Sequence, residues 1–143
     1  MITQFINYVI TLSVVTCIYV YIFDLPTKLT GAQELVEEYY YKNGLKSFIF
    51  DIFLIMIYIG IAEYISKMFK ITSMLSRNIV VSLTTCVISS IFMFYYLTRP
   101  IKSSFFASWF HTAGFFAVIY DIILITTIYF LYNKLTALKY NIY

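Results

Sequence analysis

Four long apolar stretches, separated by charged residues, dominate the sequence. The first stretch, 2–23, carries no charged side chain and ends at Asp24. Charged residues also bracket the second and third stretches, 47–66 and 78–98. The fourth, 115–132, is the second part of a longer run between Lys102 and Lys134. Each stretch is close to the length of about 20 apolar residues that an α-helix needs to cross a bilayer. The pattern therefore predicts four membrane-spanning helices.

The stretches are continuously apolar, whereas the strands of a membrane β-barrel alternate apolar and polar residues, so a barrel is excluded. The first stretch lacks the basic start of a secretory signal, and its apolar run is too long for one. We therefore expect it to remain as a helix. Lys and Arg residues divide equally between the two sides of a four-span topology, so the positive-inside rule does not choose an orientation.

The two halves of the chain resemble each other at an offset of about 70 residues. The segment that starts at Gly44, GLKSFIFDIFLI, aligns with GFFAVIYDIILI, which starts at Gly114. Chance similarity between two apolar helices is the alternative, but the scarce Gly and Asp residues match. Units 1–71 and 72–143 would then be parallel helix-hairpin repeats. We therefore expect an all-α fold class, an integral membrane four-helix bundle forming one domain over 1–143.

Each half places a glycine, a small residue and an aspartate at the same spacing. These residues are Gly44, Ser47 and Asp51 in the first half, and Gly114, Ala117 and Asp121 in the second. With 3.6 residues per turn, the members of each set share one helix face. Small residues let membrane helices approach closely. We therefore expect both aspartates to point into the bundle.

Two interpretations of Asp51 and Asp121 are open. Acids inside a membrane are costly and often mark an ion or proton path, so the pair could serve a channel. Alternatively, each acid accepts hydrogen bonds from a neighbouring helix, or pairs with a loop cation such as Lys46, Arg99 or Lys102. We favour the second interpretation, because the third span carries no complementary charge.

The remaining polar residues suggest structural roles. Glu63 and Lys67 stand four residues apart near the end of the second span, which predicts an ion pair at a helix end. Cys17 and Cys86 lie in uncharged spans without a vicinal partner, which predicts buried, unreactive thiols. We find no catalytic, metal-binding or phosphate-binding motif, so we expect no enzyme activity, metal or cofactor.

Two aromatic segments follow the first and third spans. They contain Tyr39, Tyr40 and Tyr41, and Trp109, Phe110 and His111. Tyr and Trp favour the headgroup region, and four spans would place both segments on the same membrane face. They could form a surface that contacts lipid or a partner. We favour the simpler interpretation, an ordinary aromatic belt in which His111 has no ligand role.

Composition supports a membrane location. Hydrophobic residues make up 62% of the chain and charged residues 12%. A soluble domain of this size has too little interior to hide so much apolar surface. The net charge of +3, with the basic residues spread along the chain, argues against nucleic acid as a partner.

One part of the sequence resembles a group of known proteins. The run SSFFASWF over 103–110, followed by Gly114 and AVIYDIIL over 117–124, is similar to small multi-span membrane proteins of large double-stranded DNA viruses. The many Ile, Phe and Tyr codons fit an A+T-rich genome. The resemblance implies a protein of the virion inner membrane, with minor capsid proteins as partners.

Three functions follow from these observations. The first, which we favour, is a structural membrane protein that scaffolds or anchors a larger assembly. Its partners would be the lipid bilayer and other membrane or capsid proteins. The second is a small cation or proton channel or transporter that uses Asp51 and Asp121. The third is an accessory subunit of a respiratory membrane complex, favoured by size and composition.

Overall fold

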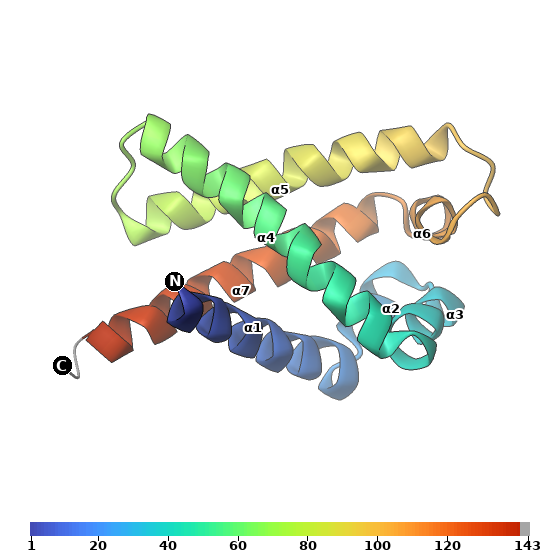
Figure 1. Ribbon diagram of the computed structural model, residues 1–143. Helices are drawn as coiled ribbons and strands as arrows, with labels where there is room; N and C mark the ends of the chain where they lie inside the picture. Colours follow the sequence, from blue (N-terminus) through green and yellow to red (C-terminus); the bar gives the residue numbers. More distant parts are fainter. Residues whose placement is uncertain (141–143) are drawn as a thin grey trace.

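The computed structural model describes residues 1–140, and this part of the chain is helical, without strands. Four long helical segments form the bundle in Figure 1: α1 (Ile2–Thr16) with its continuation η1 (Cys17–Ile22), α4 (Gly44–Met68), α5 (Met74–Leu97) and α7 (Phe115–Tyr140). All four segments are long and apolar enough to cross a membrane. The prediction of an all-α bundle with four candidate spans is therefore confirmed, which fits a multi-pass membrane protein.

The short helical elements gather at one end of the bundle. They are α2 (Leu25–Thr30), α3 (Gln33–Val36), η2 (Glu37–Lys42) and α6 (Phe105–Ala113). We call them, with their connecting loops, the cap. The N-terminus, the end of α7 and the α4–α5 connection lie at the opposite end (Figure 1). The cap therefore collects both aromatic segments on one side of the bundle.

Helix α7 is the central element of the core. It packs against α5 and α1, while α4 packs mainly on α5. Ala117, Val118 and Ile128 of α7 are fully buried. In contrast, α4 exposes large apolar side chains such as Phe53 and Ile57. An outer surface this apolar suits contact with lipid rather than water.

The helices extend beyond the predicted spans and include charged residues that the prediction places at the span ends. Lys46 and Lys67 belong to α4, which replaces the predicted 47–66, and Arg77 belongs to α5. Helical hydrogen bonds continue through the headgroup region, and long basic side chains can carry their charge to water. The fourth span also runs on, through Leu138 rather than ending at 132.

Two of the elements are π-helical turns, which the sequence analysis does not predict. The amide of Phe23 donates to the carbonyl oxygen of Ile18, and that of Asn43 donates to the carbonyl oxygen of Glu38, both at 3.0 Å. These bonds join residues five apart, as in a π-helix. The two turns also contact each other, because the Tyr21 hydroxyl donates to the carbonyl oxygen of Tyr40 at 2.6 Å.

Gly44 and Gly114 do not bring helices together as expected. Gly114 lies between α6 and α7 with φ 56° and ψ −136°, outside helical geometry, and a Cβ there would meet open space. A Cβ on Gly44 would meet only the Tyr21 hydroxyl, at 3.7 Å, which is an ordinary contact. The close-approach interpretation is therefore wrong for both glycines. Ser47 and Ala117 are buried, as that pattern predicts.

The repeat of units 1–71 and 72–143 stays a prediction. Both units place a long helix first, short cap elements next and a second long helix last. Within the second unit, α5 and α7 form the most extensive helix pair of the bundle. In the first unit, α1 reaches α4 through a bond from the Tyr8 hydroxyl to the carbonyl oxygen of Ile52, 2.8 Å long.

Candidate functional site

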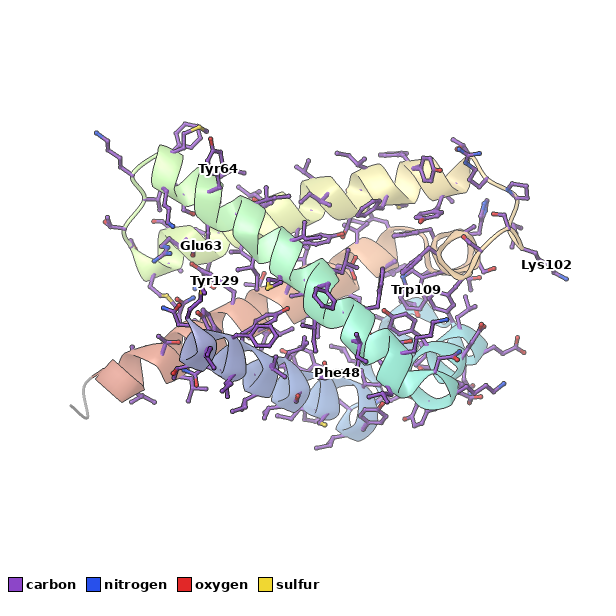
Figure 2. The ribbon with its side chains drawn as sticks, in the orientation of Figure 1. Phe48, Glu63, Tyr64, Lys102, Trp109 and Tyr129 are labelled. Atoms are coloured by element: carbon purple, nitrogen blue, oxygen red, sulfur yellow. The ribbon has the colours of Figure 1, made fainter. Side chains whose placement is uncertain are left out.

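A cavity of about 130 Å³ lies at the cap end of the bundle, between η2, α4, α5, α6 and α7. Asp51 and Asp121 both line it, together with a majority of aromatic and aliphatic side chains. Trp109 of α6 also lines this cavity and is buried (Figure 2). The structure therefore brings the two predicted intramembrane acids, far apart in sequence, to one site. We call it the aspartate cavity.

Asp51 is joined to the cap by a hydrogen bond. The Tyr39 hydroxyl of η2 donates to Asp51 Oδ1 at 2.5 Å. Tyr39 and Asp51 are twelve residues apart, and the fold of η2 onto the start of α4 brings their side chains into contact. This bond links the cap directly to the second span.

Asp121 is joined to the neighbouring spans. Ser89 of α5, which is fully buried, donates from its hydroxyl to Asp121 Oδ2 at 2.6 Å. The Tyr58 hydroxyl of α4 lies 3.2 Å from the same Ser89 Oγ. A chain of polar groups thus crosses from α4 through α5 to α7, as the hydrogen-bonding interpretation of the aspartates expects.

Tyrosine hydroxyls complete the polar lining of the cavity. The Tyr40 and Tyr120 hydroxyls lie 2.8 Å apart and join η2 to α7. Burial, followed by the neighbouring Asp51 charge, raises the pKa of Tyr39 well above its usual value, and burial likewise raises the pKa of Tyr40. Both phenols of the cap therefore stay protonated at neutral pH and can donate hydrogen bonds.

Neither aspartate meets a cation within the described part of the chain. No Lys or Arg side chain lines the aspartate cavity. The predicted loop partners lie elsewhere: Arg99, for example, packs its guanidinium over the Tyr95 ring at 4.8 Å. Each carboxylate also keeps one oxygen without a hydrogen bond to the described residues. The pairing of the acids with Lys46, Arg99 or Lys102 is thus not found.

Glu63 has a different partner from the one predicted. Arg77 Nη2 of α5 donates to both carboxylate oxygens of Glu63, and Tyr129 of α7 donates its hydroxyl to Oε1. Figure 2 shows Glu63 and Tyr129 at the end of the bundle away from Trp109. The predicted pair with Lys67 is wrong, because Arg77 of the next span pairs with the carboxylate instead.

The two aromatic segments contact each other directly. The rings of Tyr39 and Phe105 stack at 5.0 Å between centroids. Trp109 and Phe110 are buried against the bundle, so the prediction of an aromatic belt is wrong for them. Tyr41 is exposed, and the His111 Nε2 lies 2.9 Å from the carbonyl oxygen of Arg99. The segments form mostly an internal layer of the cap.

The two cysteines occupy different environments, contrary to the prediction. Cys17 is exposed, whereas Cys86 is partly buried, and both are free thiols. Cys17 lies in η1, inside a candidate span, and lines a hollow between η1 and the start of α4. The sequence pattern identifies the apolar span but not the side of the helix that faces outward.

Comparison with protein-family models, curated proteins and solved structures finds no match for this chain.

Proposed function

We propose that this chain is a structural membrane protein that anchors or scaffolds a larger assembly. The observation that carries the proposal is the set of hydroxyl-to-carboxylate bonds around the aspartate cavity. Tyr39 to Asp51 fastens the cap to α4, and Ser89 to Asp121 fastens α5 to α7. Inward-facing acids bonded in this way hold one arrangement of helices, which suits a rigid anchor.

The cap supplies the surface for contact with an assembly. Its acidic residues Glu34, Glu37 and Glu38 are exposed, and Lys102 extends from the α5–α6 loop (Figure 2). The short cap helices are held against the bundle by the buried aromatic layer. A partner outside the membrane would therefore meet a charged surface on a fixed support.

We propose further that the assembly is a virion inner membrane and its capsid. The resemblance of 103–110 and 117–124 to membrane proteins of large DNA viruses supports this choice. An accessory role in a respiratory complex is the alternative that the experiment below separates from it.

Cross-linking in native membranes tests the anchoring role. With an amine-reactive reagent, we expect Lys28, Lys42 and Lys102 of the cap to link to a protein outside the membrane. Lys67 and Lys70, at the opposite end, are the matched control and should give few such links. Mass spectrometry identifies the partner. Capsid proteins support the virion assignment, whereas respiratory subunits, or links through Lys67 and Lys70 alone, contradict it.

Asparagine variants test the bracing role of the acids. Asn keeps the shape of Asp and can still accept a hydrogen bond, so Asp51→Asn and Asp121→Asn should change unfolding free energy little. Interhelical hydrogen bonds in membranes contribute on average about 0.6 kcal/mol and at most about 1.7 kcal/mol. Tyr39→Phe, which removes the donor to Asp51, should have an effect of similar size. Thermal unfolding in detergent measures all three variants.

A second candidate function, conduction of cations or protons, is favoured by one observation. Asp51 lines the aspartate cavity and also a second hollow of about 610 Å³, between η1 and the start of α4. Flux into proteoliposomes separates the two functions. A proton or cation flux in the parent that a folded Asp51→Asn variant loses would contradict the purely structural role.

A further inference from the structure

The aspartate cavity holds two acidic groups that lack a counter-ion among the described residues. Asp51 and Asp121 each use one carboxylate oxygen to accept a hydroxyl, and the other oxygen remains available. Both side chains are partly exposed, and both line the same cavity. Two like charges in an apolar surrounding repel each other and cost free energy unless a cation or a proton compensates them.

The aromatic lining of the cavity favours a bound cation, rather than protonation of the acids alone, as the compensation of their charge. Aromatic side chains of the cap and of α5 line it, among them Tyr96, Phe106 and Trp109. The faces of aromatic rings attract ammonium groups, and cages of such rings bind quaternary ammonium ligands. Carboxylates and aromatic rings around one hollow are thus a combination that recognises positive charge on an apolar body.

The volume of the cavity suits one compact group. Its volume of about 130 Å³ is close to that of an engineered protein cavity of about 150 Å³ that holds benzene. A trimethylammonium or a short alkylammonium group is comparably compact, whereas a drug-sized molecule needs about 300 Å³ or more. The cap end of the bundle is also where lipid headgroups would lie.

We propose that the aspartate cavity binds an alkylammonium group, with Asp51 and Asp121 as its counter-ions and the surrounding rings as its cage. The group comes either from a small soluble cation or from the headgroup of an amine-bearing lipid. The proposal does not rest on the structural role, because a protein that anchors an assembly and one that does not could both hold such a ligand.

Fluorescence provides a direct test, because Trp109 is the single tryptophan of the chain and lines the cavity. The full chain in detergent is titrated with choline, tetramethylammonium and dimethylbutanol, the uncharged carbon isostere of choline. We expect the Trp109 fluorescence to change in a saturable way with the two ammonium ions. Dimethylbutanol should bind more weakly than choline, by about tenfold or more. Equal responses to choline and dimethylbutanol, or no response to either ammonium ion, would overturn the proposal.

Variants locate the binding to the two acids. The double variant Asp51→Asn with Asp121→Asn should lose the preference for choline over dimethylbutanol, while Asp24→Asn should keep it. Asp24 is the matched control because it removes the same charge from the cap side without lining the cavity. Circular dichroism confirms folding of each variant. Preference retained in the folded double variant contradicts the assignment of these acids.

The lipid surrounding the protein identifies the source of the ammonium group. In bilayer discs of phosphatidylcholine, a bound headgroup would block the response to tetramethylammonium, while discs of phosphatidylglycerol would preserve it. A response in both kinds of disc points to a soluble cation instead. Either pattern supports an ammonium site, whereas absence of a response in both kinds of disc contradicts it.

Discussion

Replacing Glu63 by Leu should destabilise the bundle by about 2 kcal/mol or more. The change leaves the Arg77 guanidinium without its carboxylate partner, near the end of a span, and leaves the Tyr129 hydroxyl without its acceptor. The side chains of Arg77 and Glu63 are only 29% and 24% exposed, so solvent replaces the lost partner poorly. Thermal unfolding in detergent, followed by circular dichroism, measures the loss.

A second change should restore most of this stability. In the double variant Glu63→Leu with Arg77→Met, no unpaired charge remains and the apolar side chains suit the surrounding helices. The free energy of unfolding should therefore return close to that of the parent. Lys67→Met is the matched control: Lys67 is exposed and has no ion-pair partner within the described residues, so its loss should change little. If Lys67→Met proves as damaging as Glu63→Leu, the sequence-based pairing is the correct one.

Gly114→Ala should destabilise the protein by about 1–3 kcal/mol, although its Cβ would touch nothing. The reason is the backbone: φ 56° and ψ −136° lie in a region that residues with a Cβ rarely adopt. Ala must either strain this junction or rotate α6 away from α7. Because α6 carries Trp109 into the aspartate cavity, its fluorescence should shift as the stability falls.

Gly60→Ala separates this backbone effect from the addition of a methyl group. Gly60 lies within α4, and a Cβ there also meets open space. Ala favours a helix interior by about 1 kcal/mol over Gly, so this variant should be as stable as the parent or more so. Equal losses at positions 60 and 114 would show that strain at Gly114 is not the cause.

The sequence predicts the spans well because a membrane helix needs a long apolar run, and such runs are plain in this chain. It places their ends less well, since a lysine such as Lys46 can belong to a helix and still reach water. The outward side of a span is also hidden, because every face is apolar. Cys17 shows this: its neighbours in sequence are as apolar as those of a buried residue, yet it is exposed.

The site is predicted only in part, and the missing parts are contacts between elements. Helical spacing suggests that Asp51 and Asp121 face inward, and the structure places both on one cavity. The donors, Tyr39 and Ser89, come from other elements, and no local pattern pairs them with these acids. For Glu63, the nearby Lys67 is a reasonable candidate, but packing of α4 on α5 brings Arg77 closer.

The position of Tyr39 in the site depends on the number of residues in the π-helical turn η2. A π-helical turn usually contains one residue more than the α-helical turn it replaces, so it behaves like an accepted single-residue insertion. The turn lies between Val36 and Gly44 and carries Tyr39, whose phenol donates to Asp51. In related chains, a one-residue deletion there would rotate the tyrosine off the acid, even with every named residue retained. An alignment gap in this segment would thus mark a loss of the site that residue identity alone does not reveal.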